Sequence, residues 1–270
     1  MRLTIEYACV SELGLVRSVN QDNYFCLDMY APRACERTDG VLNGRAEASA
    51  GALFCVFDGM GGEQSGEDAS YLAAATAAEL AKSCRVDMLR RICEEANRRI
   101  VTFTVEHGLE ACGSTAAMLY LQGSRAWVCS LGDSRVYQVH PQGLEQLSED
   151  HVMAVPGRRK PALVRYLGAE ESGAPQEPYL SSLPLKRGDR FLICSDGLTD
   201  MVAEQAIADI IAQHQAPAEA VQALKEAALA AGGRDNMTII FVQVVSLQRQ
   251  MNDFFPFSLF SPRDGTGTPK

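Results

Sequence analysis

Short apolar runs that end in an aspartate recur along this chain of 270 residues. Residues 54–57 form such a run before Asp58, and the other three aspartates of this kind are Asp133, Asp196 and Asp235. Runs this short are typical of buried strands rather than of helices. A carboxylate at a strand end is held on a rigid element and faces a loop region. We expect the four carboxylates to surround a cation, because converging like charges otherwise repel one another.

Each aspartate taken singly has an ordinary explanation. Gly132-Asp133 is a common turn pair, and Asp235 before Asn236 suits an Asx turn. Asp196 could cap the helix-like turn that leads to Asp200. Asp58 is the hardest to explain in this way, because three of the next four residues are glycines that let backbone approach a ligand closely. The prediction of a multi-metal site therefore depends on all four together.

Composition narrows the class of protein and of metal. The net charge of −9 and the absence of a basic stripe disfavour a nucleic-acid partner, and we interpret Arg158-Arg159-Lys160 as a solvated loop. No apolar run reaches the roughly 18 residues that span a bilayer, so no membrane partner is expected. Nine cysteines without zinc-type spacing indicate a reduced, cytoplasmic protein, and the four histidines are isolated. These patterns favour Mg²⁺ or Mn²⁺ over zinc.

The hydrophobic period changes along the chain in a way that predicts the fold class. Strands are expected at 3–10 with a hairpin partner at 23–29, at 52–57, as a meander at 114–121, 125–131 and 134–140, and at 190–195 and 237–245. Helices are expected at 65–83, 86–107, 203–213 and 217–231, and loops at 30–50 and 149–182. This order favours two packed antiparallel sheets with helices outside. The aromatic segment 254–260 is expected to pack on the domain surface, with a docking peptide as the alternative.

Seven motifs in a fixed order make the resemblance to one family specific. They are Arg17-Ser18-Val19-Asn20-Gln21-Asp22, Val56-Phe57-Asp58-Gly59-Met60-Gly61-Gly62, Gly113-Ser114-Thr115, Gly132-Asp133-Ser134-Arg135, Ser148-Glu149-Asp150-His151, Ser195-Asp196-Gly197-Leu198 and Gly233-Arg234-Asp235-Asn236-Met237-Thr238. Over about residues 3–246 the chain resembles the metal-dependent Ser/Thr protein phosphatases of type 2C, the PPM family, and its bacterial stand-alone members. The resemblance implies an α+β fold, a four-layer α-β-β-α sandwich with two antiparallel sheets flanked by helical pairs. It also implies a catalytic domain at 1–246, followed by an aromatic, Pro- and Gly-containing tail at 247–270.

The resemblance implies unequal roles for the carboxylates. Asp58 would bridge two Mn²⁺ or Mg²⁺ ions, with the Gly59 carbonyl reaching one of them through water or directly. Asp196 and Asp235 would complete the shell of the first ion. Asp22 would hold metal-bound water. Separately, Asp133 would serve an optional third and weaker ion with help from Asp196.

The resemblance also implies the reaction. A hydroxide that bridges two cations would attack phosphorus in line. Arg17 would clamp the phosphate oxygens through its planar fork and stabilise developing charge. The substrates would be proteins phosphorylated on serine or threonine, with a cognate Ser/Thr kinase as a plausible partner and a monomeric enzyme as the expected state.

Three positions depart from the family pattern. Met60 stands where many eukaryotic members have a histidine proposed as the general acid, and a methionine cannot donate a proton. Gln21 stands in place of a glutamate, which leaves the second ion more hydrated, and Glu63 replaces a histidine frequent in bacterial relatives. The segment 151–165, where the family has its substrate flap, is short.

Two other functions compete with a protein phosphatase. A two-metal nuclease or phosphodiesterase would use the same chemistry, but the acidic composition and the lack of a basic groove disfavour it. A pseudophosphatase that only binds phosphoproteins would be expected to lack core aspartates, yet Asp58, Asp196 and Asp235 are all present. The sequence therefore predicts an active enzyme.

Overall fold

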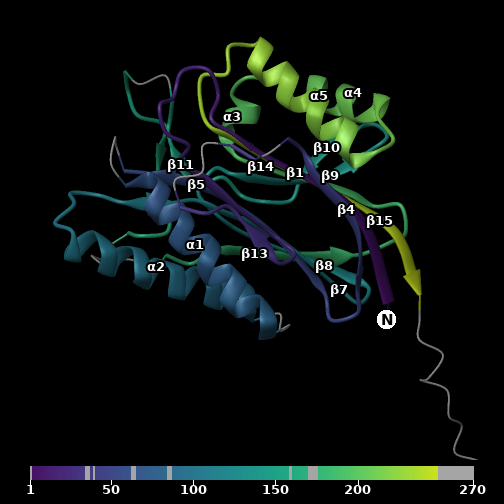
Figure 1. Cartoon of the computed structure of the whole chain (residues 1–270), viewed down its shortest axis with the longest axis horizontal. Helices are drawn as coiled ribbons and strands as arrows, with labels where there is room; N and C mark the ends of the chain where they lie inside the picture. The colour runs from purple at the N-terminus through teal and green to yellow at the C-terminus, as the bar shows by residue number, and fades with distance from the viewer. Residues whose placement is uncertain are drawn as a thin grey trace, which may run out of the picture.

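The structure, a computed structural model, describes residues 2–33, 37–38, 40–61, 65–83, 87–157, 160–169 and 176–248, which fold into two stacked antiparallel sheets (Figure 1). Within these residues the first sheet has the strand order β10-β9-β14-β15-β1-β4. Its strands are β1 (Arg2–Glu12), β4 (Leu42–Ala48), β9 (Arg135–His140), β10 (Gly143–Gln146), β14 (Arg190–Cys194) and β15 (Met237–Gln248).

The second sheet has the order β13-β8-β7-β5-β2-β3, and β6 pairs with β5 beside it. Its strands are β2 (Asp22–Cys26), β3 (Met29–Tyr30), β5 (Ala52–Met60), β6 (Gly113–Ser114), β7 (Ala116–Gln122), β8 (Arg125–Leu131) and β13 (Tyr179–Pro184). A separate pair, β11 (Val152–Met153) and β12 (Ala162–Leu163), lies in the segment where a short substrate flap was expected.

Helices cover the outer face of each sheet. The second sheet is covered by α1 (Gly66–Leu80), which continues into the 3-10 turn η2 (Ala81–Ser83), and by α2 (Met88–Glu106). The first sheet is covered by α3 (Asp196–Thr199), α4 (Glu204–Gln213) and α5 (Pro217–Ala230) (Figure 1). The predicted four layers are confirmed, and so are the two helical pairs.

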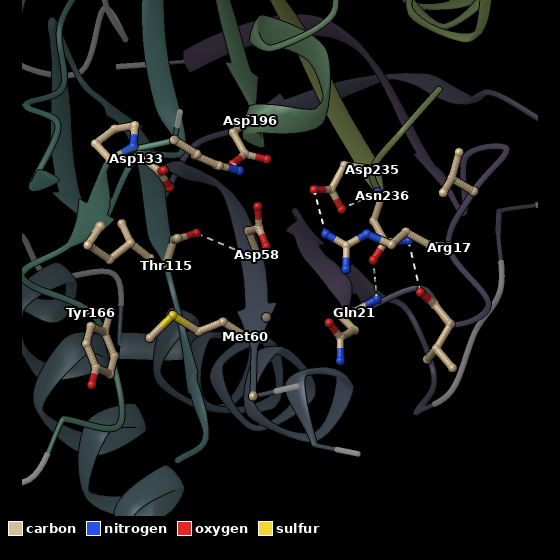
Figure 2. Close-up of a pocket in the computed structure, with 18 of the residues that line it drawn as sticks. Arg17, Gln21, Asp58, Met60, Thr115, Asp133, Tyr166, Asp196, Asp235 and Asn236 are labelled. Carbon is tan, nitrogen blue, oxygen red and sulfur yellow. Dashed lines mark hydrogen bonds and ion pairs between the residues drawn. The ribbon is translucent and has the colours of Figure 1, made fainter. Parts of the chain in front are cut away.

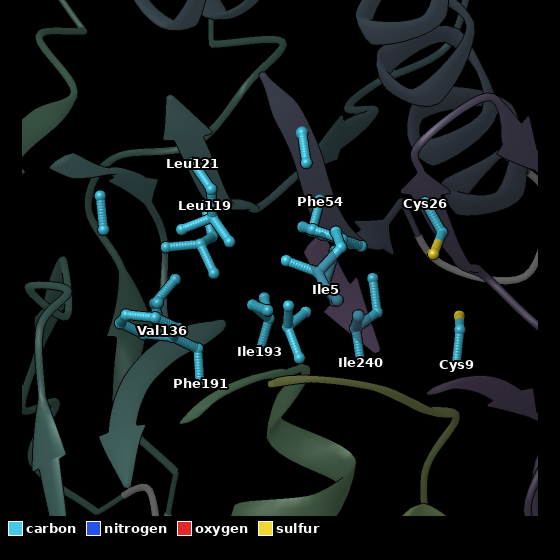
Figure 3. Packing of buried hydrophobic residues seen from close by; sticks show 14 of the residues in the cluster. Ile5, Cys9, Cys26, Phe54, Leu119, Leu121, Val136, Phe191, Ile193 and Ile240 are labelled. Atoms are coloured by element: carbon cyan, nitrogen blue, oxygen red, sulfur yellow. The ribbon is translucent and has the colours of Figure 1, made fainter. Parts of the chain in front are cut away.

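Alternation along the strands explains how one chain fills three apolar layers. In β5, Phe54 and Val56 point between the sheets, whereas Cys55 and Phe57 point toward α1 and α2. In β15, Ile240 belongs to the inter-sheet layer, while its neighbours pack under α4 and α5. Figure 3 shows Phe54 and Leu119 of the second sheet facing Ile5, Ile193 and Ile240 of the first. A strand covered on both faces is apolar along most of its length, as expected for residues 237–245, where Thr238 and Gln243 are the polar positions.

Small side chains bring α1 close to the sheet, as its alanine-rich sequence predicts. Ala69, Ala73 and Ala77 are fully buried against the second sheet. The helix begins at Gly66, with Ser65 in the N-cap position. The side chain of Ser65 makes no capping hydrogen bond. The backbone carbonyl of Ser65 accepts a hydrogen bond from Cys112 Sγ at 3.1 Å. The helix therefore starts within one residue of the predicted position, without a side-chain cap.

Four predictions about the strands and loops were wrong. Residues 23–29 do not form a hairpin with the first strand, because β2 pairs with β5 and β3 in the other sheet. Residues 30–50 are not all loop, since the whole of β4 pairs with β1, and residues 149–182 are not all loop, since β13 pairs with β8. The predicted meander stops at β8, because β9 crosses to the first sheet and pairs with β14. In each case the local pattern predicts a strand or a turn but carries no information on which sheet the strand joins.

Within the described part of the chain, no helix combines the length and apolar character needed to cross a membrane. The predicted tail falls almost entirely beyond residue 248, outside the described residues, and Glu63 also lies outside them.

Candidate metal centre

The predicted aspartates lie around an open pocket of about 760 Å³ at one end of the two sheets. Asp58, Asp133, Asp196 and Asp235 line it, as do Arg17 and the backbone of Gly59. Figure 2 shows the four carboxylates around one opening, with Arg17 on one side of Asp58 and Met60 and Tyr166 on the other.

The convergence follows from the sheet topology. Asp58 in β5 is directly paired with Asp22 in β2. Asp196 follows β14 and Asp235 precedes β15, and these antiparallel neighbours bring both residues to the same end of the first sheet. Asp133 stands in the turn between β8 and β9, where the chain crosses from one sheet to the other. Residues from both sheets therefore meet where the sheets end.

Asp58 is positioned through its backbone by Thr115. The Asp58 N–H donates to Thr115 Oγ1 at 3.0 Å, and the Thr115 N–H donates to the Asp58 carbonyl at 2.8 Å. Thr115 Oγ1 also lies 2.7 Å from Ser134 Oγ, beside Asp133. Burial, then the charge of Asp22, raises the pKa of the Asp58 carboxyl well above its ordinary value.

Asp22 is buried behind Asp58 and is only half satisfied by hydrogen bonds. Its Oδ2 accepts a hydrogen bond from Ser195 Oγ at 2.7 Å, whereas its Oδ1 is buried without a hydrogen-bond partner. Burial raises the pKa of Asp22 to about 7, although the bond from Ser195 opposes the shift. A buried carboxylate oxygen without a donor fits a role toward a cation or its water shell.

Asp196 is held by a lysine that the sequence interpretation placed in solvent. Lys160 Nζ forms a close ion pair with Asp196 Oδ2 and lies 3.4 Å from Asp200 Oδ2. Burial raises the pKa of Asp196, and the Lys160 ammonium opposes this shift. Lys160 is half exposed, in keeping with the predicted solvated loop, but it also lines the pocket. Arg158 and Arg159 lie outside the described residues.

Asp133 sits in a turn that only glycine can precede. Gly132 has φ +94°, and a Cβ there would lie 2.7 Å from Thr115 Cγ2. Burial, followed by the charge of Asp196, raises the pKa of Asp133 to about 6, while Lys160 lowers it. Asp133 thus shares its electrostatic environment with Asp196, as a shared outer cation site requires.

Arg17 reaches the pocket from the loop after β1 and is paired with a predicted metal ligand. Its Nη2 donates to Asp235 Oδ2 at 2.8 Å, and about half of its side chain is exposed (Figure 2). The guanidinium N–H groups that Asp235 does not engage are available as donors for a phosphate.

Backbone carbonyl groups lie close to the Cα of Gly59, where another residue would carry its side chain. A Cβ at this position would lie 2.1 Å from the Gly66 carbonyl oxygen and 2.4 Å from that of Gln21. Its N–H donates to the Gln21 carbonyl at 3.0 Å. Only glycine therefore fits between α1 and the 21–22 segment.

The donor chemistry of the cluster fits a hard divalent cation. Buried carboxylates with raised pKa values are stabilised as anions when positive charge is brought among them. In the described part of the chain, no three acidic, histidine or cysteine side chains are close enough together to hold a metal ion as they stand. Asp196 and Asp235 are instead paired with Lys160 and Arg17. Binding a metal therefore requires these side-chain pairs to rearrange.

Asn236 is a structural residue of the site that the sequence interpretation missed. Its side chain is buried, and its Nδ2 donates to the carbonyls of Leu13 at 2.9 Å and Val19 at 3.0 Å. Its Oδ1 accepts the Gln21 N–H at 2.9 Å. The loop that carries Arg17 is thereby fixed to the start of β15. The Asx-turn interpretation of Asp235-Asn236 noticed the residue but not its long-range partners.

The departures from the family pattern are visible in the pocket. Met60 and Gln21 both line it, and Gln21 Nε2 lies 3.5 Å from Glu67 Oε2. Neither side chain carries a charge, so the pocket floor between them is less acidic than a glutamate at position 21 would make it.

Comparisons with known proteins agree with this geometry. The sequence profile of the family described as "Protein phosphatase 2C" matches residues 44–231. The chain is 31% identical over 265 residues to the serine/threonine protein phosphatase PstP of Mycobacterium tuberculosis, covering 90% of this chain and 46% of that protein. It is 30% identical over 220 residues to the serine/threonine phosphatase stp of Listeria welshimeri, covering 73% of this chain and 86% of the relative.

A solved structure is similar over nearly the same length. The catalytic domain of PstP, in complex with two manganese ions, superposes with a TM-score of 0.72 at 30% identity, covering 90% of this chain and all of that one. The present chain spans about half the length of the mycobacterial relative.

Proposed function

Because the chain belongs to the protein phosphatase 2C family, we propose that it is a metal-dependent phosphatase that hydrolyses phosphoserine and phosphothreonine in proteins. The observation that carries the proposal is the clustering of Asp22, Asp58, Asp133 and Asp196, whose pKa values are all raised, beside an arginine with exposed donors. Such a cluster is unfavourable unless cations neutralise it. A phosphorylated substrate brings further negative charge and so increases the need for cations in the pocket.

The residues divide between holding ions and holding phosphate. Asp58, Asp196 and Asp235, with the Gly59 carbonyl, would hold two Mn²⁺ or Mg²⁺ ions, and Asp22 would hold their water. Divalent ions in such a site supply Lewis acidity that activates water and neutralises charge on phosphate. The manganese in the PstP catalytic domain supports this choice of metal. Asp133, whose pKa is raised in part by the charge of Asp196, would hold a third ion.

Arg17 would orient the phosphate group. In the metal-free site its guanidinium is paired with Asp235, and a metal ion that takes this carboxylate would free guanidinium donors for the phosphate oxygens. The loop behind it is fixed by Asn236, which limits the movement of Arg17 away from the reacting group. Met60 has no proton to give, so leaving-group protonation does not involve this side chain.

The substrate class follows from charge. Net charge −9 and the acidic pocket disfavour a polyanionic nucleic acid, against the rival function of nuclease or phosphodiesterase. A single phosphomonoester on a protein brings less negative charge. We propose proteins phosphorylated on serine or threonine as substrates, their kinase as a functional partner, and a monomeric cytoplasmic enzyme.

Hydrolysis of a phosphothreonine peptide with and without Mn²⁺ tests the proposal. We expect Mn²⁺-dependent release of phosphate by the wild type and at least a hundredfold lower rate for Asp58→Asn, since a metal-bridging charge is lost. Asp209→Asn, at an exposed position on α4, is the matched control and should retain wild-type activity. Equal rates for the wild type and Asp58→Asn would exclude the mechanism.

A further inference from the structure

Apolar side chains stand on two sides of the acidic pocket. Val16, which directly precedes Arg17, lines the opening together with Met60, Leu163 and Tyr166, and the exposed Leu15 stands next to Val16 in the chain. We propose that these five residues, the apolar rim, select phosphoprotein segments that carry an aliphatic or aromatic residue beside the phosphorylated one. The inference rests on the proposed phosphatase function and adds a substrate class to it.

The first side of the apolar rim is exposed and yet fixed. Leu15 and Val16 are each 68% exposed. The Leu15 N–H donates to the Gly233 carbonyl at 2.7 Å, and Asn236 holds the loop at both Leu13 and Val19. The side chains of Leu15 and Val16 are therefore solvent-exposed on a backbone that hydrogen bonds hold in place. A preorganised apolar surface of this kind loses little entropy when a ligand covers it.

The second side is anchored in the same manner. A Cβ on Gly113 would lie 2.7 Å from Tyr166 Cδ2 and 3.0 Å from Met60 Cε, so both side chains pack directly over this glycine. Leu167, the next residue after Tyr166, is buried and exchanges two backbone hydrogen bonds with Ser114, at 2.8 and 2.9 Å. Figure 2 shows Met60 and Tyr166 across Asp58 from Arg17. A substrate held at Arg17 thus has apolar surface on both sides.

Chain geometry places neighbouring substrate residues over this rim. A substrate held by its phosphate at Arg17 would bring its adjoining residues near Val16, which lines the same pocket. In an extended segment, positions one or two residues away lie within about 7 Å along the chain. An aliphatic side chain there removes apolar surface from water on both partners. A polar side chain would lose water without gaining a hydrogen bond from Leu15 or Val16.

Two phosphothreonine peptides test the preference directly. They have equal length and charge and differ only in carrying leucine or serine at the two positions on each side of the phosphothreonine. With Mn²⁺ present, we expect kcat/KM to be about tenfold higher for the leucine peptide. The polar peptide carries serine rather than a charged residue such as glutamate, so that repulsion by the acidic pocket does not contribute to the difference between the two peptides.

The double variant Leu15→Ser/Val16→Ser then assigns the preference to the rim. We expect the ratio of the two kcat/KM values to fall toward one. The ratio is measured within one variant, so a change in overall activity cancels. Val105→Ser replaces an equally exposed valine on α2 (66% exposed) and should keep the wild-type ratio.

Three results would overturn the inference, and they separate it from the proposed function. Equal wild-type rates on both peptides, or a ratio unchanged by the double variant, would refute the apolar rim alone. A dimer in solution that the double variant dissociates, without any peptide preference, would assign the rim to a second copy of the chain. Failure of the wild type to hydrolyse either peptide or p-nitrophenyl phosphate with Mn²⁺ would refute the phosphatase function as well.

Discussion

At the scale of one residue, Asp22 shows how a carboxyl group of the site affects the stability of the metal-free folded protein. Its carboxyl is buried, one oxygen is bonded to Ser195, and the other has no donor. Its pKa is raised from 3.8 to about 7. The metal-free folded protein therefore keeps a proton on Asp22 at pH values where the unfolded chain has lost it.

The pH dependence of stability should reveal this shift. In EDTA, the contribution of Asp22 to the free energy of unfolding should be largest below pH 4 and be lost as pH rises to about 7. Asp22→Asn should reduce the slope, with a difference on the order of a few kcal/mol between the two ends. Urea unfolding at several pH values measures it. Asp209→Asn should keep the wild-type slope, and an unchanged slope in Asp22→Asn would contradict the assignment.

Lys160 supplies a second prediction at the residue scale. Its ammonium is paired with Asp196, so it competes with any cation that uses this carboxylate. Lys160→Met should lower the dissociation constant for Mn²⁺ roughly three- to fivefold, a modest effect because half of the lysine side chain is solvent-exposed. Isothermal titration calorimetry with Mn²⁺ measures the change. Lys186→Met, at an exposed lysine, is the control, and weaker Mn²⁺ binding by Lys160→Met would contradict the competition.

At the scale of elements, Thr115 connects strands of the second sheet with the turn that crosses to the first. It bonds to the Asp58 backbone in both directions and contacts Ser134 beside Asp133. The positions of the inner and outer carboxylates thus depend on one buried hydroxyl. The β8–β9 turn is also where the predicted meander failed, because β9 leaves the sheet there.

Removing that hydroxyl without changing the shape of the side chain tests this connection. Thr115→Val leaves the partly buried Asp58 N–H without its acceptor, so we expect a loss of about 1–3 kcal/mol in the free energy of unfolding. We also expect a lower kcat, because Asp58 is positioned through this bond. Thr115→Ser keeps the hydroxyl and should retain most of both quantities. Denaturant unfolding and peptide hydrolysis measure them, and equal behaviour of the two variants would show that the hydroxyl is dispensable.

At the scale of the whole molecule, both sheets and both helical pairs are complete by Gln248, where β15 ends. We therefore propose that residues 1–246 form the catalytic domain and that 247–270 are an appended tail. The last two residues of β15 belong to the predicted tail, although they pair with the start of β1.

A truncated chain of residues 1–248 should retain stability and activity. We expect its kcat/KM for a phosphothreonine peptide to stay within about twofold of the full chain, because no pairing of the described sheets is removed. A chain that ends at Val242 is the contrasting variant. It loses the pairing of Val244 with Ile5 and should unfold at lower temperature. A large loss of stability in residues 1–248 would show that the tail packs on the domain.

The sequence by itself determined the elements and the chemical kind of site. Short continuous apolar runs predict β5, β14 and β15, and helical spacing predicts α2 and α4, because these patterns reflect local backbone geometry. Ordered motifs identified Asp58, Asp196 and Asp235, whose carboxylates do line one pocket. Their individual roles toward metal and phosphate stay predictions.

Only the tertiary structure decided which strands are neighbours and which distant groups meet. The pairing of β2 with β5, the pairing of β4 with β1 and the crossing of β9 follow from the closure of two sheets on a common core, which no local window contains. The ion pair between Lys160 and Asp196 and the bonds of Asn236 to Leu13 and Val19 join residues far apart in the chain. Local patterns record which face of an element is buried, and long-range packing decides what that face meets.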